Sequence, residues 1–176
     1  LGDIYTTAKE AGDGSYLIKG QKIFISAGDH DGVENIVHLM LAKIEGGPEG
    51  TKGISLFVVP KHRPENGTLV PNDVVTAGFE GKMGMKGCPV AHLVMGDNDN
   101  CKGWLVGKPH NGLRYMFQMM NGARISVGMM STALSSAAYY ASLEYANERP
   151  QGRKPSNRDV SSPQELIIEY ADVRRM

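Results

Sequence analysis

Four short stretches of the chain combine residue types that could take part in chemistry. In the first, Phe24 and Ser26 would share one face of a strand, so an aromatic ring and a hydroxyl could meet a planar ligand together. Packing of Phe24 in a core is the alternative, because apolar strand residues are usually buried. The four stretches are residues 22–28, 80–88, 121–124 and 148–153.

The second stretch, EGKMGMKGC, is rich in glycine and ends at Cys88. It does not follow the GxGxxG pattern of dinucleotide-binding loops, and no helical pattern follows it. Its glycines predict a bent connection between two strands.

The third and fourth stretches place arginines where a charged partner is needed. Arg124 stands among Met and Ala in the sequence NGAR. A buried unpaired charge costs several kcal/mol, so Arg124 requires a salt bridge to another helix or a contact with substrate or a catalytic carboxylate. Arg149 and Arg153 could hold a phosphate through their planar forks, or could simply complement a helix dipole.

The third stretch lies inside a long predicted helix at residues 111–149. Its large apolar residues recur at helical spacing, Asn111 can cap its first turn, and Pro150 and Gly152 oppose its continuation. Such a helix would be roughly 55 Å long. We therefore expect it either to cross a whole subunit or to belong to a helical bundle larger than this chain supplies.

Residues 3–107 have the pattern of short strands joined by turns. Residues 15–26 predict a hairpin that turns at Lys19, Gly20 and Gln21, and further strands are predicted at residues 35–44, 53–60, 70–76, 91–95 and 104–106. Such a series is typical of a β-sandwich or small barrel. The period changes after residue 108, which predicts one domain at residues 1–108 and another at 109–176. A second helix is predicted from Pro163 onward, with Ser162 as its N-cap.

The composition excludes several classes of protein. The 19 basic residues balance the 19 acidic ones, so no overall field favours nucleic acid or an anionic membrane. No apolar run is long enough to span a bilayer, and the first residues of the sequence do not have the basic region followed by an apolar region that is typical of a signal peptide. Cys88 and Cys101 form no CxxC pair and the histidines are scattered, so we expect no metal site and a reduced, cytoplasmic compartment. The abrupt ends of the sequence predict a piece of a longer polypeptide.

In their order along the chain, the four stretches resemble the acyl-CoA dehydrogenase family. Phe24, Ile25 and Ser26 stand where the family has a Trp-Ile-Thr strand against the flavin of FAD. Cys88 ends a turn similar to the family's LGMRGS, in place of the serine that touches acyl-CoA. Residues 121–124 fall on the substrate-contacting tetrapeptide, often Asp-x-x-Arg, so the resemblance makes Asn121 and Arg124 substrate-binding residues.

The end of the long helix carries the remaining part of the resemblance. Arg149 and Gln151 match the family's Arg-x-Gln/Thr pair, which reaches the FAD of a neighbouring subunit, and Tyr170 lies where another FAD contact is made. The resemblance is strongest to large bacterial members, the group that includes 3-methylmercaptopropionyl-CoA dehydrogenase. It implies an α+β chain: an antiparallel β-barrel or sandwich middle domain, followed by the first helices of an incomplete C-terminal helical bundle.

The activity implied by the resemblance is α,β-dehydrogenation of an acyl-CoA to the 2-enoyl-CoA, as in fatty acid β-oxidation. The implied cofactor is FAD, the implied electron acceptor is an electron-transfer flavoprotein, and the implied assembly is a homodimer or homotetramer. Three alternatives are an acyl-CoA oxidase, a non-catalytic nucleic-acid-binding flavoprotein of the same fold, and a β-sandwich interaction module without a cofactor.

No residue of this chain is expected to be the catalytic base. In the family the base is a glutamate late in the C-terminal domain or, in one branch, immediately before the substrate-contacting arginine, where this chain has Ala123. Alanine cannot accept a proton, and Glu144 would lie about 30 Å from Arg124 along a helix. The resemblance therefore places the base after Met176, and we expect this chain alone to hold FAD poorly.

Overall fold

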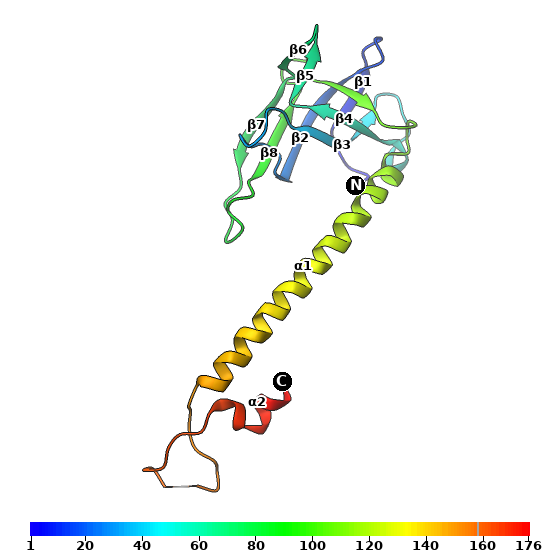
Figure 1. Cartoon of the computed structure of the whole chain (residues 1–176). Helices are drawn as coiled ribbons and strands as arrows, with labels where there is room; N and C mark the ends of the chain where they lie inside the picture. The colour runs from blue at the N-terminus through cyan, green and yellow to red at the C-terminus, as the bar shows by residue number, and fades with distance from the viewer. Residues whose placement is uncertain (158) are drawn as a thin grey trace. The chain divides into compact units, whose positions relative to one another are not determined.

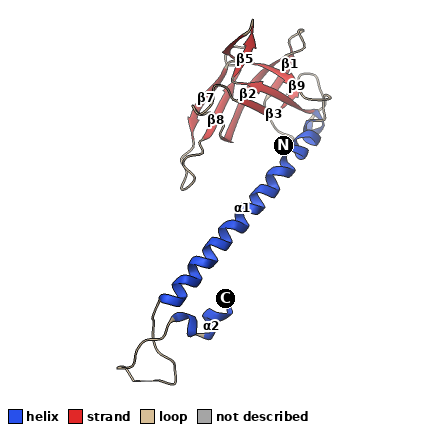
Figure 2. Cartoon of the chain, viewed as in Figure 1, coloured by secondary structure: helices blue, strands red, loops and turns tan. Residues whose placement is uncertain are grey.

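The computed structural model describes residues 1–157 and 159–176 and divides into two units, Leu1–Met119 and Met120–Met176. Unit 1 holds all the described strands and the first turns of the long helix, and unit 2 holds the rest of that helix and the segment after it (Figure 2). In the described part of the chain, no helix is both long and apolar enough to cross a membrane.

The strands are short apart from one. They are β1 (Thr7–Glu10), β2 (Tyr16–Ser26), β3 (Val37–Ile44), β4 (Ile54–Pro60), β5 (His62–Glu65), β6 (Thr68–Pro71), β7 (Val74–Phe79), β8 (Val90–Met95) and β9 (Lys102–Leu105). The helices are α1 (Gly112–Glu148) and α2 (Ala171–Arg175), with 3₁₀ turns η1 (Gly50–Gly53) and η2 (Ile167–Glu169).

Five strands of unit 1 close into a ring. They pair in the order β1-β3-β4-β9-β2, and β1 pairs with β2 as well, which completes the circle. The second half of β2 leaves this ring and pairs with β8, which pairs with β7, so these strands form an open wing (Figure 1). This arrangement confirms the predicted small barrel.

The ring encloses the core of unit 1. Phe57 of β4 is fully buried and meets the ring of Tyr16 edge to face, with centroids 5.1 Å apart. Ile18, Met40 and Val59 complete the centre of this core. Residues on both faces of β4 are buried, and Gly112 packs against Ser55 of this strand.

A buried amide joins three segments of the wall. Asn72, between β6 and β7, donates from Nδ2 to the carbonyls of Pro60 at 2.7 Å and Lys102 at 2.8 Å. Its Oδ1 accepts from the Lys102 amide at 2.9 Å and from Arg63 at 3.2 Å. Every donor and acceptor of this fully buried side chain thus has a partner.

The predicted hairpin at residues 15–26 is wrong, because β2 runs through it as a single strand. Gly20 is not part of a turn. It allows the backbone of β2 to pass close to Thr6, since a Cβ on Gly20 would lie 2.9 Å from the Cα of Thr6. The first half of β2 pairs with β1 and β9 and the second half with β8. β1 directly precedes β2 in the chain, but β8 and β9 lie far along it, so a local turn signal could not reveal those two pairings.

Two further elements differ from the sequence prediction. The strand predicted at residues 70–76 is broken into β6 and β7, and Asp73 at the break has a φ of 52°. The helix predicted from Pro163 is also wrong, since α2 begins only at Ala171, with Tyr170 as its N-cap. Leu166 instead forms a β-bridge with Pro150.

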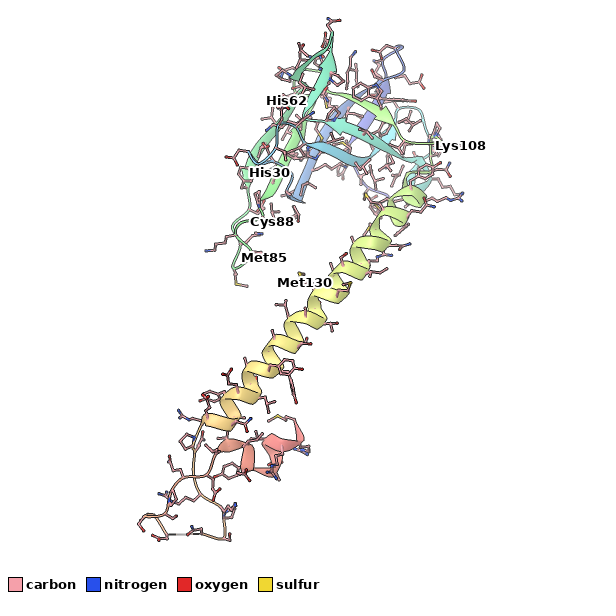
Figure 3. All side chains as sticks on the ribbon, in the orientation of Figure 1. His30, His62, Met85, Cys88, Lys108 and Met130 are labelled. Atoms are coloured by element: carbon pink, nitrogen blue, oxygen red, sulfur yellow. The ribbon has the colours of Figure 1, made fainter. Side chains whose placement is uncertain are left out.

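The prediction of the long helix is confirmed by α1, which covers Gly112–Glu148. The backbone carbonyl of Asn111 accepts a hydrogen bond from the Tyr115 amide at 3.3 Å, as the residue before a helix does. Within unit 2, α1 buries only Ala146 among residues 121–148 and leaves several large apolar side chains exposed, Met130 among them (Figure 3).

Candidate functional site

A groove separates β2 from β3 where β1 does not reach. β1 begins at Thr7, which pairs with Lys19 of β2 and Lys43 of β3. Beyond this level β2 continues to Ser26 and β3 extends back to Val37. The groove between them has a volume of about 520 Å³, and Ile25 and Ser26 line it together with mostly aliphatic side chains.

A β-bulge shapes the wall of this groove. Lys22 pairs with Leu93 of β8 and the pairing resumes at Ile25 with Ala91, so residues 23 and 24 share one partner, His92. Phe24 has a φ of 60° and leaves 67% of its surface exposed. A left-handed backbone is costly for so large a residue. The regular alternation that predicted a shared face for Phe24 and Ser26 is interrupted here.

Two ionisable side chains, which the sequence analysis missed, also line the groove. Lys22 donates from Nζ to the Leu41 carbonyl at 2.9 Å and so bridges β2 and β3, and burial lowers the pKa of its ammonium group. Burial likewise lowers the pKa of His38, and its Nε2 is buried without a hydrogen-bond partner among the described residues. Lys22 lies in the first of the four stretches, directly before the apolar run Ile23, Phe24 and Ile25, and this position was the available signal.

The turn with Cys88 lies at the same end of the wing as Phe24, Ile25 and Ser26. Ser26 pairs with Val90, and the Ala27 amide donates to the Pro89 carbonyl at 2.7 Å. Figure 3 shows Cys88 and Met85 on the loop that joins β7 to β8. This loop confirms the predicted bent connection. Cys88 is a half-buried free thiol.

The segment that follows β2 is fixed by a polar cluster. Asp29 forms an ion pair with Lys61 at 2.6 Å and accepts a hydrogen bond from Thr76 Oγ1 at 2.6 Å. Burial raises the pKa of Asp29, but the bonds from Lys61 and Thr76 outweigh burial and hold that pKa below its usual value. The cluster thereby fastens the chain after Ser26 to β7 and to the segment before β5.

In unit 2, Asn121 and Arg124 lie one helical turn apart on α1. Nη1 of Arg124 donates to Oδ1 of Asn121 at 3.4 Å, and both residues are exposed. The structure therefore brings the two predicted substrate-binding residues of α1 together on one face of the helix.

Of the three predicted FAD-binding residues of unit 2, Gln151 and Tyr170 are hydrogen-bonded to each other, and Arg149 bonds to the same segment before α2. The Arg149 carbonyl accepts from the Ile167 amide at 2.9 Å, and the Gln151 amide donates to the Glu165 carbonyl at 2.8 Å. The hydroxyl of Tyr170 donates to the Gln151 carbonyl at 2.8 Å. The backbone on either side of Pro150 is thus held against the segment before α2.

The part of the chain that the structure describes contains no cluster of side chains suited to bind a metal ion. No group of three or more His, Cys, Asp or Glu side chains there could hold a metal ion. Cys101 is fully buried, and burial raises the pKa of its thiol to about 12, with the negative charge of Asp73 contributing. A thiol with this pKa stays protonated at neutral pH and is a poor nucleophile.

His38 should make the stability of the chain fall as the pH drops below about 6.5. Burial lowers its folded-state pKa, so just below pH 6.5 the unfolded chain binds more protons and acidification favours unfolding. The stabilising contribution of neutral His38 is fully present above pH 6.5 and is lost as the pH falls toward the folded-state pKa. Over this range the unfolding free energy falls by at most about 1.4 kcal/mol per pH unit. The negative charge of Asp29 raises the pKa of His38, and the positive charge of Lys61 lowers it. The titration of Asp29 itself affects stability only below about pH 3.8.

Urea unfolding between pH 7.5 and pH 4.5 measures this effect. His38→Phe keeps a ring at the position but removes the titration, so its stability should vary less over this range. His110→Gln, at an exposed position that leaves His38 in place, serves as the control. An unchanged pH dependence in His38→Phe would mean that His38 does not cause it.

The family model for the acyl-CoA dehydrogenase middle domain matches residues 1–98. Butyryl-CoA dehydrogenase of Syntrophomonas wolfei is 47% identical over 170 residues, covering 93% of this chain and 28% of the relative. The 3-methylmercaptopropionyl-CoA dehydrogenase of Ruegeria pomeroyi is 44% identical over 179 residues, covering 100% of this chain and 29% of the relative.

The chain therefore spans less than a third of the length of these curated relatives. Among solved structures, Caenorhabditis elegans ACDH-11 in complex with C11-CoA matches with a TM-score of 0.73 and 26% identity, covering 99% of this chain and 26% of that one. Butyryl-CoA dehydrogenase of Megasphaera elsdenii matches with a TM-score of 0.72 at 22% identity, covering 99% and 39%, and shows the fold alone.

Proposed function

The chain belongs to the acyl-CoA dehydrogenase family, and from this premise we propose that it forms part of an FAD-dependent enzyme that converts an acyl-CoA to the 2-enoyl-CoA. The single observation that carries the proposal is the groove of unit 1, whose lining includes Ile25 and Ser26 from the stretch that resembles the family's flavin-contacting strand. The relatives named above act on butyryl-CoA and 3-methylmercaptopropionyl-CoA, as their names state.

The groove suits a flat, largely apolar ring with one polar edge. Its volume of about 520 Å³ is bounded mainly by aliphatic side chains, and Lys22 and Ser26 add polar groups at one side. The imidazole of His38 is buried there without a hydrogen-bond partner among the described residues. Phe24 is not among the residues that line the groove, but it directly precedes Ile25, is exposed, and has a strained left-handed backbone of the kind often found at ligand sites. These features fit the isoalloxazine of FAD.

We assign roles to the remaining residues on the same basis. Phe24, Ile25 and Ser26 would pack against the flavin, whereas Arg149, Gln151 and Tyr170 would hold the FAD of a neighbouring subunit in a homodimer or homotetramer. A bound FAD would supply the hydride acceptor of the reaction. The chain's own part is to exclude water from the flavin face and to orient the cofactor.

The substrate and electron partners follow from the same proposal. Cys88, Asn121 and Arg124 would contact the acyl-CoA, and an electron-transfer flavoprotein would receive the electrons. We also propose a cytoplasmic location, which the free thiols of Cys88 and Cys101 favour because disulfides are rare in that compartment.

We place the domain boundary between residues 108 and 109. β9 ends at Leu105 and α1 begins at Gly112, so the change from strand to helix falls there. The first turns of α1 nevertheless belong to unit 1, because Gly112 lies against β4: a Cβ on Gly112 would be 2.5 Å from the carbonyl carbon of Ser55.

A chimeric enzyme tests the proposed function. In it, this chain replaces the matching 170 residues of the Syntrophomonas wolfei butyryl-CoA dehydrogenase. We expect one FAD per chain and loss of the flavin absorption when butyryl-CoA is added without oxygen. A second chimera limited to residues 1–108 separates the barrel from the helix. A folded chimera that retains FAD but is never reduced would contradict the proposal, and hydrogen peroxide formation in air would indicate an oxidase.

Phe24 offers a test of the flavin contact within this chimera. Phe24→Gly and Phe24→Ala both remove the ring, so both should weaken FAD binding by about threefold to tenfold. Glycine adopts the left-handed backbone freely, so the glycine variant should be about 1 kcal/mol more stable than the alanine variant. FAD titration and urea unfolding measure the two effects. Undiminished FAD affinity in both variants would remove Phe24 from the site.

A further inference from the structure

Residues 149–152 and 165–167 form a small antiparallel ladder in unit 2. Pro150 and Leu166 form a β-bridge. The Gln151 amide donates to the Glu165 carbonyl at 2.8 Å, and the Glu165 amide donates to the Gly152 carbonyl at 3.1 Å. This ladder presents the side chains of Arg149 and Gln151, which are both exposed.

Arg153 closes the loop that joins the two sides of the ladder. Its Nε donates to the Ser162 carbonyl at 2.7 Å, and its Nη2 donates to the Val160 carbonyl at 2.6 Å. Asn157 Nδ2 adds a bond to the Ser162 hydroxyl at 3.1 Å inside the loop. Residue 158 of this loop lies outside the described residues.

The two arginines of this region are therefore used differently. The guanidinium of Arg153 donates two hydrogen bonds to the backbone carbonyls of Ser162 and Val160. No hydrogen bond or ion pair joins the guanidinium of Arg149 to another described residue, and Arg149 is exposed. Of the two, only Arg149 presents its full donor fork to a phosphate.

We propose that Arg153 is a positioning residue, a clasp that binds the carbonyls of Val160 and Ser162 and so holds the ladder that presents Arg149 and Gln151. Bringing the two ends of a loop of this length together costs conformational entropy, and charge-assisted hydrogen bonds to two carbonyls offset that cost. The part of the inference that concerns FAD rests on the proposed function, whereas the clasp itself does not.

Amide hydrogen exchange on the chain tests the clasp without any cofactor. In Arg153→Ala, the amides of Gln151 and Glu165 should exchange about tenfold faster, because each donates a hydrogen bond within the ladder. The amide of Arg149 is an internal control, since it bonds to the Tyr145 carbonyl at the end of α1. Unchanged exchange at Gln151 and Glu165 would overturn the inference, whatever the FAD experiments show.

FAD binding to the chimera distinguishes a positioning residue from a direct ligand. The decisive variant replaces residues 153–164 by a short glycine-containing turn, which deletes Arg153 and its loop together. FAD affinity should fall several-fold in Arg153→Ala and return close to the original in the short-turn variant. Persistent loss of affinity in a short-turn variant whose ladder amides remain protected would identify Arg153 as a direct ligand and overturn the proposal.

The salt dependence of FAD binding gives a second readout. Arg149→Ala should make binding less sensitive to salt and should also weaken the oligomer in sedimentation, because a charge is lost from a cross-subunit contact. Arg153→Ala should keep the original salt dependence, and a reduced dependence would count against its positioning role. A chimera that binds no FAD in any form would reject the proposed function, while the exchange result would stand.

Discussion

Asn72→Asp should lower the unfolding free energy of the chain by about 3 to 5 kcal/mol. The change replaces Nδ2 by an oxygen of similar size, so it leaves no cavity. It removes both donors, and the carbonyls of Pro60 and Lys102 would then face an acceptor at about the 2.7 and 2.8 Å of the native bonds. Arg63 would offset part of this cost, because its Nη1 lies 3.2 Å from Oδ1 of Asn72.

Urea unfolding at pH 7 measures the loss. Asn66→Asp is a matched control, since Asn66 is exposed in the turn between β5 and β6 and has a φ of 49°, which aspartate tolerates. The control should stay within about 0.5 kcal/mol of the original chain. The deficit of Asn72→Asp should shrink at lower pH, where the new carboxyl gains a proton and can donate. A loss below about 1 kcal/mol would show that the Asn72 bonds contribute little.

The chain alone, when loaded with FAD, should show no flavin bleaching by butyryl-CoA. The reason is that no carboxylate stands where the family's base would act: Ala123 directly precedes Arg124 on α1. Asp99 belongs to unit 1, where it forms an ion pair with Lys19 at 2.7 Å. In the chimera, by contrast, the glutamate that the family resemblance places downstream of the exchanged segment should support bleaching, and its replacement by glutamine should slow the reaction by roughly 10² to 10⁴.

Ala123→Glu provides the complementary test. In the chimera that lacks the downstream glutamate, this change places a carboxylate on α1 next to Arg124 and should restore part of the bleaching rate. Ala123→Gln has nearly the same size but cannot accept the proton, so it should restore nothing. Bleaching by the chain alone would contradict the assignment of the base to another part of the enzyme.

The sequence predicted best those elements whose bounds are determined by residues within the element or directly beside it. α1 was placed within one residue at each end, because its apolar spacing, Asn111 and Pro150 all act within a few residues. The break between β6 and β7 depends on Asn72, whose side-chain partners are distant in the chain. The prediction of a helix from Pro163 was wrong because the segment before α2 pairs with residues 150–152 instead. Local helix propensity carries no information about this pairing.

The candidate site could be predicted only in part for the same reason. The motif order singled out Phe24, Ile25 and Ser26, of which Ile25 and Ser26 line the groove, yet the bulge at residues 23 and 24 arises from pairing with β8. β7 has its own irregularity opposite the same residue, His92. The roles of Lys22 and His38 depend on the gap that β1 leaves between β2 and β3, which no periodicity within a single strand reveals.

The closed ring of unit 1 has a consequence for how the polypeptide acquires its structure. β3 and β4 are close in sequence and can pair soon after they are synthesised, but β2 must wait for β9, its ring partner near the end of unit 1. Folding slows as the sequence separation of contacting residues grows, so ring closure should be a late step. Until Lys102–Leu105 has left the ribosome, β2 and β4 each lack their β9 partner, and this nascent species is the one most exposed to aggregation.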